Sequence, residues 1–268
     1  MPYFKSNNVR IFYEERGTGT PILFLHGFSL DHRMWSEQLA YFSSWYRTIA
    51  MDARGHGQSD APESGYARED RVADVLNLMA ELKLPQVHLV GLSMGGGDAL
   101  AMAVDHQDKL LSLTLADTVA SGYKPKVRPR EPKEHIAEKG LEIFKEMFIE
   151  SSLSRYGKEM QDIKSKLATM MRAFSGKPWT DPKKGKYPKR DDLKMAASVR
   201  IPTLIIAGKR DIAWLPLSQK LSEIILDSRL VVLSGAGHMS NMEAPDRFNE
   251  TLAAFLKEID IKARRPRN

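Results

Sequence analysis

A serine stands between two glycines in the pentapeptide Gly91-Leu92-Ser93-Met94-Gly95. Strand-forming residues precede it at 86–90, and a small-residue stretch of helical character follows at 96–106. In a strand, tight turn and helix, Gly-x-Ser-x-Gly lifts a serine hydroxyl above the edge of a sheet as a nucleophile. The glycines leave room for so sharp a turn because they carry no Cβ atom. We therefore expect Ser93 to act as a nucleophile.

A serine hydroxyl attacks efficiently only when a base takes its proton and an acid orients that base. In a parallel sheet, such partners lie on loops after the carboxyl ends of later strands. Asp211 closely follows the apolar run at 203–207. His238 follows the run at 230–233 in the same way. The chain order Ser93, Asp211, His238 predicts a catalytic triad.

Asp117 is a second candidate for the acid. It comes directly after the apolar run at 110–116, so it could also reach His238 from a neighbouring loop. Its alternative interpretation is a helix cap or a loop carboxylate. The spacing favours Asp211 and leaves Asp117 as the alternative.

Attack on a carbonyl carbon places negative charge on the carbonyl oxygen, and two backbone N–H groups can hold that charge. We expect one donor to be Met94, directly after the nucleophile. The other is Phe28, which follows His26-Gly27 at the end of an earlier apolar run. These two residues are the predicted oxyanion hole.

No metal site or cofactor is predicted. His26 and His56 are expected to make structural hydrogen bonds beside the site, and the other histidines to be ordinary surface or core residues: His32, His88, His106 and His135. None has the spacing of a metal ligand set. The sequence Gly17-Thr18-Gly19 lacks a third glycine and a following helix, so it does not predict a dinucleotide loop.

The surrounding elements alternate between strands and helices. Besides the runs above, apolar runs at 9–15, 22–25 and 46–51 predict strands. Helices are predicted at 31–42, 68–82, 96–106, 215–226 and 244–259. This alternation predicts an α/β fold with a mostly parallel sheet between helices.

The alternation stops between residues 118 and 198. That segment has no strand signal but holds amphipathic helical stretches at 135–151 and 158–174, with a Pro/Gly/Lys-rich loop at 176–190. We therefore expect a core domain of residues 1–117 and 199–268 and a helical cap of residues 118–198.

Composition sets limits on partners and compartment. The 268 residues can bury a full core. No run is long enough to cross a bilayer, and the N-terminus lacks an apolar signal region. We expect a cytoplasmic protein that does not bind membranes. The chain has no cysteine, which excludes disulfides and a Cys nucleophile.

The net charge of +6 is uneven, because residues 118–195 hold 19 Lys and Arg against 11 Asp and Glu. No nucleic-acid-binding motif accompanies this charge, so no nucleic-acid partner is predicted. A solvated basic surface is the favoured interpretation. The alternative is that one basic loop attracts anionic substrates. Its residues are Lys183, Lys184, Lys186, Lys189 and Arg190.

The sequence resembles the α/β-hydrolase superfamily over nearly its whole length. The matching residues are His26-Gly27-Phe28, Asp52-x-Arg54-Gly55-His56-Gly57-x-Ser59, Gly91-x-Ser93-x-Gly95, Asp211 and His238. The resemblance implies the α/β-hydrolase fold, with an eight-stranded sheet and a helical cap inserted after the sixth strand. Serine at position 93 disfavours the dehalogenases and epoxide hydrolases of this superfamily, which use Asp there.

Within the superfamily, the segment from His26 to Trp35 looks like that of enol-lactone hydrolases, and the elbow is similar to theirs and to that of cofactor-free haloperoxidases and aryl-esterases. The expected activity is hydrolysis of a small carboxylic ester or lactone through an acyl-enzyme. A carbon–carbon bond hydrolase with the same triad, or a small-molecule receptor with vestigial activity, are the alternatives. The substrate's identity depends on the cap, and no oligomeric state is predicted.

Overall fold

The computed structural model describes residues 2–125, 132–183 and 189–264. Within them eight strands form one sheet in the order β1-β2-β4-β3-β5-β6-β7-β8. The strands are β1 (Tyr3–Ser6), β2 (Val9–Arg16), β3 (Pro21–Leu25), β4 (Arg47–Met51), β5 (Val87–Leu92), β6 (Leu110–Ala116), β7 (Thr203–Gly208) and β8 (Ser228–Leu233).

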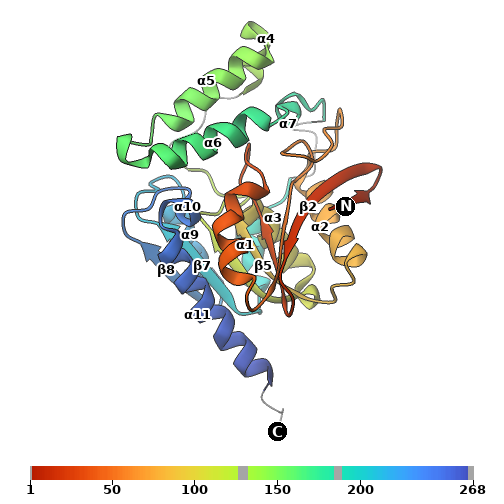
Figure 1. Cartoon of the computed structure of the whole chain (residues 1–268), viewed down its shortest axis with the longest axis vertical. Helices are drawn as coiled ribbons and strands as arrows, with labels where there is room; N and C mark the ends of the chain where they lie inside the picture. Colours follow the sequence, from red (N-terminus) through yellow and green to blue (C-terminus); the bar gives the residue numbers. More distant parts are fainter. Residues whose placement is uncertain (1, 126–131, 184–188, 265–268) are drawn as a thin grey trace.

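Helices connect most of these strands (Figure 1). They are α1 (Ser36–Phe42), α2 (Arg68–Glu81), α3 (Met94–Asp105), α4 (Pro132–Lys139), α5 (Leu141–Leu153), α6 (Gln161–Ala173), α7 (Lys177–Thr180), α8 (Asp192–Met195), α9 (Leu215–Ile224), α10 (Ser240–Glu243) and α11 (Pro245–Arg264). Short 3₁₀ turns are η1 (His32–Trp35), η2 (Gln107–Lys109), η3 (Lys158–Met160) and η4 (Ala196–Ser198).

The sheet is mostly parallel, as predicted. Strands β4, β3, β5, β6, β7 and β8 pair in parallel, whereas β1 with β2 and β2 with β4 pair antiparallel. The sequence analysis identified seven of the eight strands and missed β1. That edge strand has only four residues, which is too short for a clear alternation of apolar and polar side chains.

Helices cover both faces of the sheet because successive side chains of a strand point to opposite sides. In β3, Leu23 and Leu25 join the core under α2, α3 and α9, whereas Ile22 and Phe24 join the core under α1 and α11. The central strands β3 and β5 are therefore mostly apolar and are buried on both faces.

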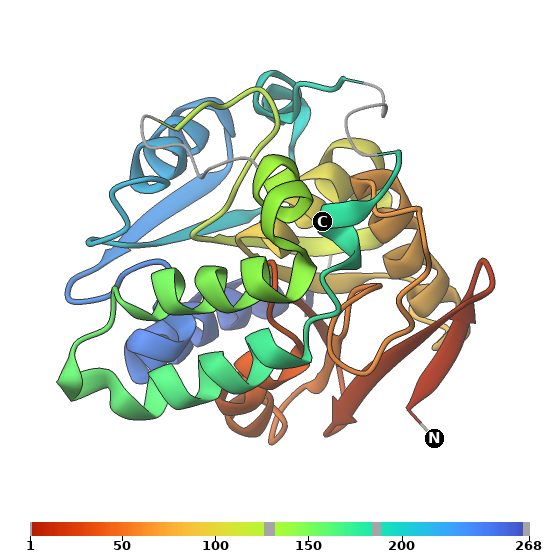
Figure 2. The same ribbon diagram turned by 90° about the horizontal axis from the view of Figure 1, so that it is seen from above.

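The segment between β6 and β7 is helical, as predicted. Figure 1 shows α4, α5 and α6 above one end of the sheet, and Figure 2 shows α5 and α6 side by side across it. The helix predicted at 135–151 is two helices, because Gly140 adopts a φ of +85° between α4 and α5. The loop predicted at 176–190 contains the single helical turn α7, where Trp179 is buried.

No helix in the part of the chain that the structure describes combines the length and apolar character needed to span a bilayer.

A buried ion pair ties the edge of the sheet to the loop after β4. Arg54 donates from Nε and Nη2 to the carboxylate of Asp74 on α2, at 2.8 and 2.7 Å. The side chains are 5% and 0% exposed. Ser6 of β1 also donates to Asp74, at 2.5 Å. Three elements are therefore joined through one carboxylate.

Asp74→Ala is expected to destabilise the protein by about 3–5 kcal/mol, because it leaves the buried Arg54 guanidinium with only the more distant carboxylate of Asp70, at 3.9 Å. The free energy of unfolding in urea measures this loss. Asp108→Ala is the control: it removes a carboxylate paired with Lys109 at the surface, and such pairs contribute about 1 kcal/mol or less. Equal losses in the two variants would contradict the assigned role of Asp74.

Candidate active site

Ser93 lies at the turn between β5 and α3 with φ 53° and ψ −113°, a conformation that L residues rarely adopt. Close backbone contacts explain the two glycines. A Cβ on Gly91 would lie 2.2 Å from the carbonyl oxygen of Gly95, and a Cβ on Gly95 would lie 2.3 Å from that of Leu25. The predicted elbow is therefore present, with the nucleophile candidate held in a strained turn.

The structure brings Ser93, His238 and Asp211 into one hydrogen-bonded line. His238 Nδ1 lies 2.6 Å from Asp211 Oδ2, and His238 Nε2 lies 2.9 Å from Ser93 Oγ. Because a carboxylate only accepts, Nδ1 carries the proton and donates it to Asp211. The lone pair of Nε2 then faces Ser93, which donates its hydroxyl proton. This is the arrangement that a general base requires.

Asp211 raises the affinity of His238 for a proton. Burial lowers the pKa of His238, but the hydrogen bond and negative charge of Asp211, with a smaller contribution from the charge of Asp117, raise it above the ordinary value of 6.5. The backbone N–H of Trp214 donates to the other oxygen of Asp211, at 3.3 Å, and helps to fix that carboxylate. An imidazolium formed at His238 is thereby stabilised.

Asp117, the alternative acid, has other partners. Its two oxygens accept the backbone N–H groups of Gly208, at 2.7 Å, and of Ser240, at 3.2 Å. Burial raises the pKa of Asp117 to about 7, against the lowering effect of His238 and these two bonds. Asp117 therefore stabilises the loops that carry Asp211 and His238. The carboxylate that accepts the ring N–H of His238 is that of Asp211.

Of the predicted oxyanion donors, Met94 directly follows Ser93 in the elbow, and Phe28 lies in the loop after β3. No acceptor among the described residues takes the backbone N–H of Phe28 or of Met94. His26 stabilises the loop that carries Phe28. The N–H of Ala53 donates to His26 Nε2 at 2.9 Å, and His26 Nδ1–H donates to the Gly27 carbonyl at 2.8 Å. Burial lowers the pKa of His26, which keeps the ring neutral for this double role.

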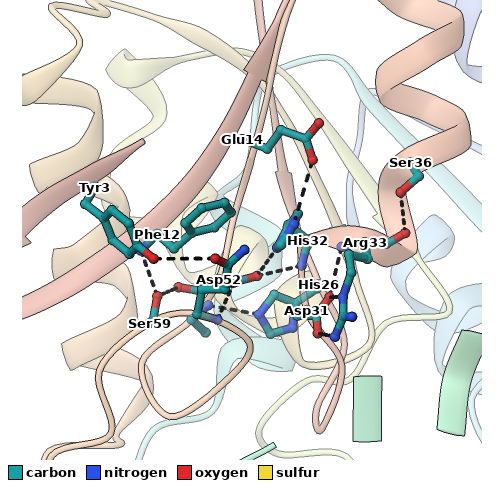
Figure 3. Close-up of polar contacts among 12 residues, drawn as sticks. Tyr3, Phe12, Glu14, His26, Asp31, His32, Arg33, Ser36, Asp52 and Ser59 are labelled. Atoms are coloured by element: carbon teal, nitrogen blue, oxygen red, sulfur yellow. Dashed lines mark hydrogen bonds and ion pairs between the residues drawn. The ribbon is translucent and has the colours of Figure 1, made fainter. Parts of the chain in front are cut away.

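A polar network joins His32 to carboxylates of two neighbouring segments (Figure 3). His32 donates from Nδ1 and from its backbone N–H to the same oxygen of Asp52, each at 2.7 Å. Glu14 lies on the far side of the ring, 3.7 Å from Nε2. Burial lowers the pKa of His32, but the nearby carboxylates raise it by more than burial lowers it, so the pKa lies above its ordinary value. The sequence analysis treated His32 as ordinary and missed this pair.

Asp31, His32 and Asp52 have the composition of a metal ligand set and lie close together. Their donor atoms already have partners, however. Arg33 binds both oxygens of Asp31, at 2.9 and 2.6 Å. The second oxygen of Asp52 accepts the backbone N–H of Gln58, at 2.8 Å. The cluster is therefore accounted for by hydrogen bonds within the protein, and we assign no metal to it.

Aromatic side chains of the inserted segment close over the Phe28 loop. The Phe28 ring lies 5.1 Å from Phe174 and 5.7 Å from Trp179, both between β6 and β7. A cavity of about 390 Å³ adjoins them. It is lined by Phe28, Arg54, His56, Tyr66, Ala67, Arg68, Arg71, Met94, Pro178, Trp179 and Asp181. Both candidate oxyanion donors thus belong to residues that line one cavity.

The cavity's arginines already have anionic partners. Arg54 binds Asp74, and Arg71 binds both oxygens of Asp98, at 2.7 and 2.8 Å. Arg68 is paired with Glu69 and Asp192. The cavity wall therefore carries no clear excess of positive charge.

The basic loop, for which attraction of anions was the alternative to a solvated surface, is only partly described. Lys184 and Lys186 lie outside the described residues. Arg190 is paired with Asp105 and Asp192, whereas Lys183 and Lys189 are exposed. The solvated surface stays the favoured interpretation, and attraction of anionic substrates by this loop stays the alternative.

His238 is expected to titrate with a midpoint above pH 6.5, because Asp211 and Asp117 favour its protonated form. His56 should titrate well below 6.5, because its buried ring disfavours the charge. The ring-proton NMR shifts of both residues, followed against pH, test this. Asp211→Asn should move the His238 midpoint downward. A midpoint at or below 6.5 in the unaltered protein would contradict the inferred contact.

Comparison with known proteins agrees with this geometry. Residues 20–245 match the family model of the alpha/beta hydrolase fold. The chain is 32% identical to the AB hydrolase superfamily protein YisY of Bacillus subtilis, over 94% of this chain and 98% of that protein. It is 28% identical to 3-oxoadipate enol-lactonase 1 of Acinetobacter baylyi, over 89% of each.

A solved structure has the same fold. The enol-lactonase of Burkholderia xenovorans LB400 superposes with a TM-score of 0.84 at 26% identity, covering 96% of this chain and 100% of that one. The predicted fold and the resemblance to enol-lactone hydrolases are confirmed. An eight-stranded, mostly parallel sheet, a strained serine elbow and a family match over most of its length establish that this chain belongs to the α/β-hydrolase family.

Proposed function

We propose that the protein is a serine hydrolase that cleaves a small carboxylic ester or lactone through an acyl-enzyme. The observation that carries this proposal is the line of hydrogen bonds from Ser93 through His238 to Asp211. Phe28 and Met94, whose backbone N–H groups are the candidate oxyanion donors, both line the cavity of about 390 Å³. A nucleophile, a base, an orienting acid and two oxyanion donors are the parts that acyl transfer needs.

In the first half of the reaction, Ser93 Oγ attacks the carbonyl carbon while His238 Nε2 takes its proton. The carbonyl oxygen becomes an anion and accepts hydrogen bonds from the N–H groups of Phe28 and Met94. His238 then protonates the leaving alkoxide as the bond to the alcohol breaks. In a lactone, acid and alcohol belong to one ring, so the alcohol stays attached to the acyl group.

In the second half, a water molecule attacks the acyl-enzyme. His238 takes a proton from the water and returns it to Ser93 Oγ as the bond to the serine breaks. Asp211 keeps the ring in the tautomer that each step requires. The carboxylic acid leaves, and the enzyme returns to its starting state.

The cavity and the relatives support a small ester or lactone as the substrate. A volume of about 390 Å³ is at the small end of the range for ligand sites, which favours a compact substrate. Two of the similar proteins are named as enol-lactonases, so lactones are the first candidates. We further propose that residues 118–198 act as a cap that determines specificity, because Phe174 and Trp179 from this segment pack against Phe28.

Ser93→Ala is expected to leave the fold intact and to lower turnover of p-nitrophenyl acetate by roughly 10⁴-fold or more, because it removes the nucleophile. Circular dichroism checks the fold, and the rate of p-nitrophenol release measures turnover. Lactones and open-chain esters of equal size, assayed in one panel, then define the preferred class. Undiminished hydrolysis by the variant would contradict the mechanism. Tight ligand binding without turnover by the unaltered protein would favour a receptor.

Asp211→Asn is expected to lower kcat on the order of 10⁴-fold, since an amide favours the wrong histidine tautomer. Asp117→Asn is the matched control. It changes a buried carboxylate near His238 that bonds to backbone N–H groups of Gly208 and Ser240. We expect a smaller loss there, about tenfold or less, because one of its two acceptors remains. If the larger loss occurs in Asp117→Asn, the acid has been misassigned.

A further inference from the structure

We propose that Glu243 is a positioning residue that fixes the backbone on both sides of His238. The backbone N–H of Gly237 donates to Glu243 Oε2 at 2.7 Å. The N–H of Met239 donates to Glu243 Oε1 at 3.1 Å. One carboxylate thus holds the residue before the histidine and the residue after it. This inference rests on the proposed function, in which His238 is the base.

Both oxygens of Glu243 are needed for this contact. Its side chain is 4% exposed, so water does not readily replace a lost acceptor. A glutamine at this position would accept one of the two N–H groups and direct its own amide N–H toward the other. A backbone donor would then be left without a partner, and the loop would have to shift.

Glu243 also lies between neighbouring parts of the site. Arg210, next to Asp211 in the chain, donates to Glu243 Oε2 at 3.3 Å. Tyr156, from the segment between β6 and β7, lies near Glu243. Burial is the main reason that the pKa of Tyr156 is raised, and the negative charge of Glu243 is the next. The loops of the acid and the base and one residue of the inserted segment therefore meet at one side chain.

Small displacements of His238 matter because both of its ring contacts are short. Misplacing a catalytic group by about 1 Å can cost about 100-fold in rate. Glu243 touches neither Ser93 nor the ring of His238 in the described contacts. Its effect must therefore pass through the backbone of residues 237–239.

The test compares Glu243→Gln with two controls. Glu258→Gln changes an exposed carboxylate on α11 that pairs with Arg229 and Lys262. Tyr156→Phe removes the hydroxyl near Glu243 but leaves both backbone bonds. Each variant is first checked for its melting temperature. Turnover is then measured on the best ester or lactone of the panel, together with the rate of Ser93 labelling by diisopropyl fluorophosphate.

In that labelling, the bond from Ser93 Oγ to phosphorus forms as the phosphorus–fluorine bond breaks. Fluoride leaves, and His238 takes the serine proton. We expect Glu243→Gln to remain folded and to reach full labelling, but about 10- to 100-fold more slowly. Its kcat should fall by a similar factor with KM within about twofold. Both controls should stay within about twofold of the unaltered protein in every rate.

A readout independent of turnover separates the two proposals. Because Asp211 raises the pKa of His238, a loosened ring contact should move the NMR titration midpoint of His238 down toward 6.5 in Glu243→Gln. Absence of labelling in the unaltered protein would overturn the proposed function, while the midpoint would still decide the role of Glu243. An unchanged midpoint with unchanged rates, or equal losses in Tyr156→Phe, would overturn the positioning role.

Discussion

The hydrogen bond between His238 and Asp211 is the interaction on which the rest of the site depends. It decides which nitrogen of the ring carries the proton, and so whether the other nitrogen can accept from Ser93. Burial alone would disfavour a charged ring, and the adjacent carboxylate reverses this. The surrounding structure serves to keep three side chains from distant parts of the sequence within this geometry.

The parallel sheet supplies most of that precision. Strands β5, β7 and β8 end at the same edge, so the loops that carry Ser93, Asp211 and His238 start from fixed positions. Carboxylates then stabilise those loops through backbone N–H groups: Asp117 binds Gly208 and Ser240, and Glu243 binds the neighbours of His238. Buried charges near the site thus act mainly on loop backbone.

Much of this could be predicted from sequence, because the strands are apolar on both faces and the elbow has fixed glycine spacing. Ser93, Asp211 and His238 were found by their places after predicted strands, and the structure brings them together. The break at Gly140, the turn around Trp179 and the pair of His32 with Asp52 were missed. Each depends on local backbone conformation or on contacts between distant segments, which periodicity does not report. Glu243 was missed for the same reason.

The inserted helical segment begins and ends on neighbouring strands. Asp117 N donates to the Ile206 carbonyl beside the carboxyl end of β7, and the chain re-enters β7 at Thr203, opposite Leu113 of β6. The entropy of closing such an excursion grows only slowly with its length, by about 0.6 kcal/mol for each doubling. The fold can therefore carry segments of very different length and sequence at this point without altering the path of the sheet. This junction is a natural place for exchanging whole segments between related chains while the sheet and the loops at its strand ends stay unchanged.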